Sequence, residues 1–318
     1  MSLLTKSYYA MGTKITLSVS HSSPENQLNR GYALIKYYEK LLTVNTTDSE
    51  VSLINQAAGK HAVHVSSISY NLIKKAIEIS KKNLGFDVAI GPLIKLWHIG
   101  FSDAKLPKKQ NIEKKLRLID PKQTVLNDQK KSVFLKKYGM ELDLGAIAKG
   151  YIADAISKLW RKEKVKRGII NLGGNVLMVG PSPHPNNLWN VGIQDPFKKR
   201  NNSLAILKIP ALSVVTSGIY ERFLNFKGRR YHHILDPKTG YPIKNNLASV
   251  TVVSQKSIDG EIWTGIGFYN GFYRTLKLLP PKNLGFIFIT KDYKLYITSN
   301  IKKNLIPLEK RYQIKEIH

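Results

Sequence analysis

The sequence predicts an α+β fold, with two intimately joined lobes and a mostly antiparallel sheet. Apolar residues recur at helical spacing in a few segments, and many short strands follow with few helices between them. The chain has 318 residues, 42% of them hydrophobic, which is enough to bury a sizeable core. We expect residues 1–318 to form a single unit, with the lysine-rich, weakly patterned segment 102–138 as an excursion between the lobes.

Local sequence patterns predict the individual helices and strands. Residues 14–19 alternate polar and apolar side chains, as in a half-buried opening strand. Ser23 and Pro24 supply a cap and a first-turn proline for the first helix. We expect helices at 24–42, at about 69–82, up to about 161 and at about 258–280. Strands are expected at 168–172, 176–179, 188–194, 203–209, 247–254, 284–290 and 293–298.

The charge balance narrows the possible partners. Fifty Lys and Arg residues against 22 Asp and Glu give a formal charge of +28, which attracts nucleic acid, anionic lipid or phosphorylated ligands. The basic residues form short runs without interleaved aromatic residues, so we expect a solvated basic surface and no nucleic-acid partner. The chain has no cysteine, which excludes disulfides, thiolate zinc sites and a cysteine nucleophile. Any metal must be held by oxygen or histidine.

The segment Glu141–Tyr151 places Asp143 before an expected helix start and Lys149 in the first turns. A helix N-terminus with a lysine beside it is an anion site. The same pattern also fits an ordinary N-cap aspartate with a solvated lysine.

Two glycine-containing turns follow. Gly173-Gly174 lies between two expected strands and is most simply a turn. No Gly-x-Gly-x-x-Gly follows a strand, which disfavours a Rossmann dehydrogenase. The turn Asp236-Pro237-Lys238-Thr239-Gly240 lies beside His233, which fits either a base or a structural histidine.

The segment Ser257–Thr264 gathers hard oxygen ligands at an expected helix start. Such oxygens suit Mg²⁺ or Ca²⁺, although acids in a first turn also serve simply to compensate the helix dipole.

Seven segments, taken in this order, resemble the ApbE-like FAD:protein FMN transferases, the flavin transferase family. They are Ala10–Thr13, Asp48–Asn55, Phe86–Leu93, Asp143–Gly150, Asn171–Gly174, Thr216–Gly218 and His233–Pro242. The resemblance spans about residues 8–275 and implies an ApbE-like fold. It also implies an enzyme that binds FAD with Mg²⁺, cleaves the pyrophosphate, attaches FMN to a threonine of an acceptor protein and releases AMP.

The resemblance also implies roles for individual residues. It assigns FAD binding to Met11, Asn45, Ala89, Ile90, Gly91, Asp143, Lys149 and His233, and metal binding to the Ala146 backbone oxygen, Asp259 and Thr264. His233, Lys149 and Asp259 are the expected catalytic residues, with His233 as base and Lys149 as positive charge near the phosphates.

Three positions depart from the family pattern. Asn45 stands where relatives usually carry an aromatic residue that packs on the ligand, and Asn175 stands where an aspartate is common. Asp259 and Thr264 are five residues apart instead of four, about 140° around an ideal helix. Either Asp259 precedes the helix as a cap, which we prefer, or Glu261 replaces it as the ligand.

Other functions and the cellular setting stay open at this point. The alternative is an FAD-binding protein or an FAD pyrophosphatase that gives FMN and AMP. The resemblance implies acceptor flavoprotein subunits such as those of redox-driven ion pumps, and the basic charge is compatible with a membrane surface. It further implies the cell envelope, on the periplasmic side of the inner membrane, with a lipid anchor on a leader absent from the printed sequence.

Overall fold

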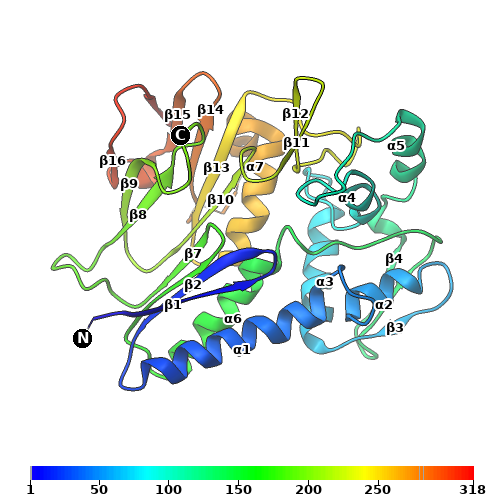
Figure 1. Cartoon of the computed structure of the whole chain (residues 1–318), viewed down its shortest axis with the longest axis horizontal. Helices are drawn as coiled ribbons and strands as arrows, with labels where there is room; N and C mark the ends of the chain where they lie inside the picture. The colour runs from blue at the N-terminus through cyan, green and yellow to red at the C-terminus, as the bar shows by residue number, and fades with distance from the viewer. Residues whose placement is uncertain (1, 279, 282) are drawn as a thin grey trace. The chain divides into compact units, whose positions relative to one another are not determined.

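A computed structural model describes residues 2–278, 280–281 and 283–318. The chain divides into two compact units, and each is described by itself (Figure 1). Unit 1 comprises Met1–Tyr38, Lys149–Gly218 and Asn245–His318, and unit 2 comprises Glu39–Ala148 and Ile219–Lys244.

Unit 1 is built on a large twisted sheet, which has nine strands among the described residues. In spatial order they are β1 (Leu4–Ala10), β2 (Thr13–Ser20), β6 (Arg167–Leu172), β7 (Asn175–Val179), β10 (Ser213–Gly218), β13 (Leu247–Ser254), β14 (Gly285–Thr290), β15 (Lys294–Thr298) and β17 (Gln313–Ile317). Neighbouring strands pair antiparallel except β15 and β17, which are parallel. The prediction of a mostly antiparallel sheet in an α+β fold is confirmed.

Helices cover one face of this sheet: α1 (Pro24–Leu42), α6 (Ala148–Lys162) and α7 (Ser257–Lys277). A Cβ built on Gly31 of α1 would lie 3.2 Å from Leu17 of β2, and one on Gly260 of α7 would lie 2.6 Å from Val215 of β10. The cross-strand register places Leu17, Ile170, Leu177 and Val215 on the same face. The apolar side of each strand therefore decides where the helices lie.

The opposite face of the sheet carries a second layer in unit 1. It is a three-stranded sheet of β8 (Trp189–Gln194), β9 (Ser203–Ile209) and β16 (Leu305–Pro307), and the short helix α8 (Ser299–Lys302) follows β15. Buried residues such as Trp189, Leu207, Val214 and Ile289 form the core between the two sheets.

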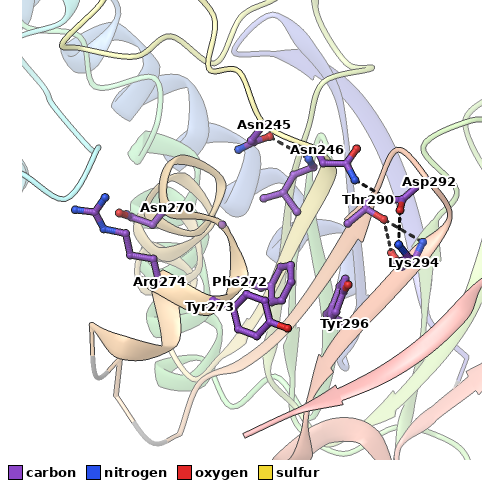
Figure 2. A pocket seen from close by; sticks show the side chains of 12 residues that line it. Asn245, Asn246, Asn270, Phe272, Tyr273, Arg274, Thr290, Asp292, Lys294 and Tyr296 are labelled. Carbon is purple, nitrogen blue, oxygen red and sulfur yellow. Dashed lines mark hydrogen bonds and ion pairs between the residues drawn. The ribbon is translucent and has the colours of Figure 1, made fainter.

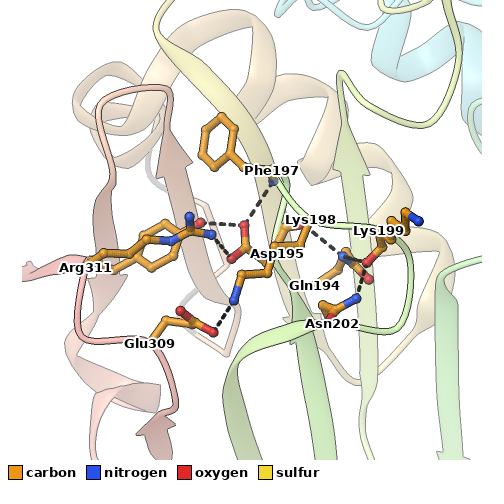
Figure 3. A network of polar contacts seen from close by, with 9 residues as sticks. Gln194, Asp195, Phe197, Lys198, Lys199, Asn202, Glu309 and Arg311 are labelled. Atoms are coloured by element: carbon orange, nitrogen blue, oxygen red, sulfur yellow. Dashed lines mark hydrogen bonds and ion pairs between the residues drawn. The ribbon is translucent and has the colours of Figure 1, made fainter.

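A polar network closes the end of this second layer (Figure 3). The side chain of Asp195, just after β8, is fully buried and pairs with the Arg311 guanidinium. It also accepts hydrogen bonds from the Tyr312 hydroxyl (2.7 Å) and the Phe197 N–H (2.9 Å). The carboxylate thus fixes the segment before β17 against the β8–β9 connection.

Unit 2 contains smaller elements. Its helices are α2 (Glu50–Gln56), α3 (Ser67–Ser80), α4 (Gly91–Trp97), α5 (Lys109–Leu116) and the short 3₁₀ helix η1 (Pro121–Gln123). Its strands form a sheet of β3 (Val63–His64), β5 (Ser132–Leu135) and β4 (Thr124–Asn127), and a separate hairpin of β11 (Phe223–Phe226) and β12 (Arg229–His232). Buried Leu93, Trp97, Ile112 and Leu235 form one of its cores.

Several predicted elements coincide with observed ones. The strands expected at 203–209 and 247–254 have the same bounds as β9 and β13, and the helix expected at 258–280 is α7, which breaks at Gly271 (φ 70°, ψ 173°). The segment 102–138 contains α5, η1, β4 and β5 and lies within unit 2. No helix in the described part of the chain is long and apolar enough to cross a membrane.

Candidate active site

The first turns of α6 and α7 pack closely together in unit 1. A Cβ on Gly150 would lie 2.7 Å from both the Ser257 oxygen and the Ile258 Cα, so only glycine permits this approach. Asp154 of α6 accepts hydrogen bonds from the N–H groups of Ser257 (2.7 Å) and Ile258 (3.0 Å). The carboxylate of one helix therefore caps the other and fixes where α7 begins.

The observed start of α7 shows that the preferred prediction for Asp259, a cap before the helix, is wrong. Helix α7 begins at Ser257, with Lys256 at the N-cap, so Asp259 lies in the first helical turn and does not precede the helix as a cap. The reason is that Asp154, which is distant in sequence, satisfies the first N–H groups and starts the helix earlier. The five-residue spacing from Asp259 to Thr264 thus lies wholly on the helix, about 140° around it.

Glu261 is held in a buried network. Its Oε1 atom accepts a hydrogen bond from Asn175 Nδ2 (2.8 Å) and lies 3.7 Å from Lys149 Nζ. The Ser257 hydroxyl in turn donates to Asn175 Oδ1 (2.6 Å). Both groups at Oε1 are donors, so Glu261 is suited to position the half-buried Lys149 ammonium. Lys149 is therefore paired within unit 1 instead of being simply solvated.

Thr264, one turn further along α7, is fully buried. Its hydroxyl donates to the Glu261 carbonyl (2.9 Å) and accepts a hydrogen bond from the Ser217 hydroxyl (3.0 Å). The Thr216-Ser217-Gly218 segment at the end of β10 thus lies against α7.

Two tight turns of unit 1 meet at the ends of their strands. Met11 and Gly12 turn from β1 to β2 with positive φ (52° and 66°), and Gly173 and Gly174 turn from β6 to β7 (70° and 97°). A Cβ on Gly173 would lie 2.6 Å from the Thr13 side chain. The structure therefore brings together the Ala10–Thr13 and Asn171–Gly174 segments that the sequence analysis singled out.

In unit 2, the Ala89-Ile90-Gly91 turn lies beside the segment that precedes α6. Ile90 and Glu141 form a parallel bridge, and a Cβ on Gly91 would lie 2.6 Å from the Glu141 oxygen. The Asp143 N–H donates to the Val88 carbonyl (2.9 Å). Residues 88–91 and 141–143 are thus held together by their backbones.

Two carboxyls of unit 2 have raised pKa values. Burial raises the pKa of Asp87 to about 6, against the hydrogen bond that it accepts from the Ala89 N–H (2.8 Å). Burial also raises the pKa of Asp143, while the hydrogen bond from the Gly145 N–H (2.7 Å) opposes that rise. Ala146, two residues before α6, is exposed. This segment offers a perturbed acid next to exposed backbone.

His233 and Asn45 complete the predicted set in unit 2. The His233 N–H and its ring Nδ1 both donate to the Arg222 carbonyl, each at 3.1 Å, which leaves the ring lone pair on Nε2 in the neutral form. The Asp236–Tyr241 loop beside it is fixed by the Trp97 indole, which donates to the Gly240 carbonyl (2.8 Å). Asn45 is exposed, and its N–H donates to the Thr43 hydroxyl (3.1 Å).

The predicted residues thus fall into two groups. Met11, Lys149, Asp259 and Thr264 belong to unit 1, and Asn45, Ala89, Ile90, Gly91, Asp143, Ala146 and His233 belong to unit 2. Within the described ranges, no three His, Cys, Asp or Glu side chains cluster as metal ligands. A hard cation here would need backbone and hydroxyl oxygens in addition to a single acid.

The whole chain is similar to proteins of one family. The sequence profile of the ApbE family matches residues 11–288. A relative from Klebsiella pneumoniae, named FAD:protein FMN transferase, is 43% identical over 306 residues, which covers 96% of this chain and 94% of the relative. A relative of the same name from Treponema pallidum is 32% identical and covers 91% of this chain and 83% of its own length.

Solved structures agree with this. The ApbE protein of Thermotoga maritima superposes with a TM-score of 0.87 at 26% identity, covering 95% of this chain and 99% of that one. The chain belongs to the ApbE family. The flavin transferase ApbE of Vibrio cholerae superposes at 0.81 with 22% identity over 95% of this chain and 99% of its own, which shows the shared fold. The family resemblance and the ApbE-like fold predicted from the sequence are confirmed.

Sequence reasoning on this ApbE chain missed the polar partners inside unit 1. Asp154, Asn175 and Ser257 hold Glu261 and the start of α7, but nothing local in the sequence shows which residues they pair with. Two features of the sequence could have indicated this packing: the small Gly150 in α6, and Asn175 in place of the aspartate that is common in the family.

A cavity of about 340 Å³ lies elsewhere in unit 1, at the break of α7 (Figure 2). Its lining includes Phe272 and Tyr296, whose rings stack 3.9 Å apart, and the Asp292–Lys294 ion pair. None of the predicted site residues lines it.

Proposed function

We propose that this ApbE-family chain is an FAD:protein FMN transferase. The observation that carries the proposal is the sequence identity of 43%, over nearly the full length, to a protein of that name. In the reaction, an acceptor hydroxyl forms a bond to the FMN phosphorus, the bond from that phosphorus to the bridging oxygen breaks, and AMP leaves with that oxygen. A base takes the hydroxyl proton.

The acceptor group in this proposal is a threonine. His233 suits the role of base, since its Nδ1 is committed as a donor to the Arg222 carbonyl and its Nε2 carries the lone pair. Lys149 suits the phosphates, because Glu261 and the start of α6 hold its ammonium in place. Met11, Asn45, the Ala89–Gly91 turn and Asp143 are proposed to contact FAD.

We further propose Mg²⁺ as the cation, with Asp259, Thr264 and the Ala146 carbonyl as ligands. The donor set fits a hard ion, because it offers oxygens only. Glu261 is the weaker candidate ligand, since Asn175 and Lys149 already occupy its Oε1 atom. When bound, the cation would supply positive charge that neutralises the charge developing on the phosphates.

A single incubation tests the transferase. The protein is mixed with FAD, Mg²⁺ and a flavin-acceptor domain, and the masses of the acceptor and the nucleotides are measured. We expect the acceptor to gain one FMN through its threonine, with one AMP released. Free FMN and AMP with an unmodified acceptor would indicate an FAD pyrophosphatase, and intact FAD would contradict both.

The metal ligands are tested in the same assay. We expect turnover to stop when a chelator is added, and Asp259→Ala to lower it at least ~100-fold, as when a catalytic metal is displaced. The matched control Asp292→Ala removes an exposed acid of the same unit and should retain activity. Wild-type turnover in Asp259→Ala would move the ligand to Glu261 or remove the metal from the mechanism.

The cellular setting is also proposed. We place the protein at the cell envelope, on the periplasmic side of the inner membrane, as a membrane-associated lipoprotein acting on flavoprotein subunits of redox-driven ion pumps. The formal charge of +28 supports a position near anionic lipid. Fractionation of cells expressing the full native gene tests this, and recovery in the cytoplasm would contradict it.

A further inference from the structure

The β11–β12 hairpin of unit 2 stands apart from the sheets. Its strands pair from Phe223↔His232 to Phe226↔Arg229, and no other strand of the described chain pairs with either one. The turn residues Lys227 and Gly228 both have positive φ (48° and 73°), as in the tight hairpin turns that match strand twist. Neither edge of this ribbon is therefore paired with another strand of the described chain, which is what the addition of an extended segment of another chain requires.

The hairpin is strongly basic. Arg222, Lys227, Arg229 and Arg230 lie on or beside it and are exposed, whereas Glu221 is the one acid next to them in the sequence. Among the ion pairs of the described residues, none involves these four cations. Arg222 also acts on the Asp143 carboxyl, where it opposes the rise in pKa that burial causes. Lys227, Arg229 and Arg230 form none of these ion pairs and attract an anionic segment.

The hairpin is held to unit 2 near its strand ends, where His232 is buried and its Nε2 donates to the Ile243 carbonyl (3.0 Å), and its tip is exposed. Leu224 and Tyr231 pack on the unit 2 core, where the Tyr231 ring lies 5.6 Å from that of Trp97. The alternation along the strands places Phe223 and Arg230 on the other side, with the guanidinium 4.1 Å from the ring centroid. At the tip, Phe226 is 40% exposed. By the same alternation Phe226 and Arg229 lie on the side of Leu224 and Tyr231, so the exposed end of the hairpin carries a cation on each face.

The two ends of the hairpin meet at the proposed base. The Arg222 carbonyl accepts the hydrogen bonds from the His233 N–H and Nδ1, so His233 lies where the two strands of the hairpin join the rest of unit 2. If an acceptor segment bound along the ribbon, a hydroxyl at the end of the hairpin away from the turn would lie near this imidazole. A lipid headgroup would gain nothing from this position, which favours a protein partner.

We propose that the β11–β12 hairpin is the docking surface for the acceptor protein, and that it binds an extended acidic segment flanking the modified threonine. This rests on the proposed transferase function. A strand rises about 3.3 Å per residue, so four-residue strands span about 13 Å. Acidic residues within about four positions of the threonine would therefore lie beside Lys227, Arg229 and Arg230.

The test is a charge reversal with a matched control. The double variant Arg229→Glu/Arg230→Glu is compared with Lys136→Glu/Lys137→Glu, which makes the same charge change at exposed lysines of unit 2. The probes are two fluorescein-labelled peptides with one threonine, flanked either by glutamates or by lysines. Fluorescence anisotropy with FAD and Mg²⁺ present gives the Kd, and Lys227→Glu provides a second, milder variant.

We expect the wild type to prefer the acidic peptide and to lose that preference as salt is raised. The hairpin double variant should bind it at least about tenfold more weakly and should gain affinity for the lysine peptide, because juxtaposed like charges are costly. The control should stay within about twofold, and the Kd for FAD should be unchanged in both variants. Equal binding of the acidic peptide by both double variants would overturn the proposal.

Two further outcomes separate the alternatives. If the hairpin variant loses binding only to phosphatidylserine vesicles and keeps binding to the acidic peptide, the hairpin is a lipid surface and the proposal is wrong. If the wild type transfers no FMN to an acceptor domain, the transferase proposal fails whatever the peptides show. Transfer by the hairpin variant with a wild-type KM for the acceptor would overturn the docking proposal alone.

Discussion

The carboxylates beside the candidate site are held in opposite ways in the two units. In unit 1, Glu261 and Asp154 receive donors from residues 86 and 103 positions away in the sequence. In unit 2, Asp87 and Asp143 accept hydrogen bonds from backbone N–H groups only two residues further along. The unit 1 acids fasten separate elements together, whereas the unit 2 acids shape only their own turns.

The electrostatics follow the same division. Burial would raise the pKa of Asp195 in unit 1, but the Phe197 N–H, the Tyr312 hydroxyl and the Arg311 guanidinium together lower it. Burial raises the pKa of Asp143 and brings that of Asp87 to about 6, and one local N–H does not offset it. Carboxyls whose burial is not offset by hydrogen-bond donors are suited to contact a ligand. Carboxyls with several donors are suited to stabilise the fold.

The largest effect is expected at Asp195. Asp195→Ala removes the acceptor shared by Arg311 and Tyr312 and should lower the free energy of unfolding by about 3 kcal/mol, since Arg311 is partly exposed. Urea unfolding of both proteins measures this. Because the folded pKa is lowered, the contribution is present above the unfolded pKa of about 4 and is lost as the pH falls below it. If the difference in free energy of unfolding between the wild type and Asp195→Ala grew towards low pH, this account would be wrong.

The next effect is expected at Asn175. Asn175→Asp replaces the donor to Glu261 with a like charge and should cost about 2 kcal/mol at pH 7. One carboxyl of the new pair would have a raised pKa, so its cost should shrink as the pH falls. Thermal unfolding at pH 7 and pH 5 measures this, with Asn175→Ser as a neutral control. Unchanged stability at both values would show that the network does not hold α7.

A smaller effect, and on binding instead of stability, is expected at Asp143. Asp143→Ala removes only one local hydrogen bond from the fold, but it should weaken FAD binding about tenfold, or about 1.4 kcal/mol. Calorimetry with FAD and Mg²⁺ measures the affinity, and the melting temperature is the control. Unfolding at a much lower temperature with unaltered FAD affinity would reverse the comparison between the units.

The smallest effect is expected at Asp87. Because its folded pKa of about 6 is above the unfolded value of about 4, its charge destabilises the fold at neutral pH. Asp87→Asn should therefore raise the stability by about 1 kcal/mol at pH 7, since the amide also has to be desolvated. The gain should shrink as the pH falls from 6 to 4. A gain independent of pH would mean that the carboxylate is not the cause.

Much of the fold could be predicted from local patterns. Alternation of polar and apolar residues fixes where a strand lies and which face it buries, and β9 and β13 have the predicted bounds. The turn at Gly173-Gly174 follows from the glycine pair, because both residues adopt positive φ. The ordered motifs likewise identify the family, since residue type and order are properties of the sequence alone.

The tertiary structure alone decided how the polar residues are paired. The role of Asp259 as a cap was wrongly predicted because Asp154, which caps α7, comes from a helix 103 residues earlier. The partners of Glu261 and the close approach at Gly150 likewise depend on two helices that meet only in the folded chain. Local periodicity reports burial, whereas hydrogen-bond partners are set by which distant segments come together. The sequence therefore determined the fold class and the family, and the packing of α6 on α7 decided that Asp154 and Glu261 are structural partners.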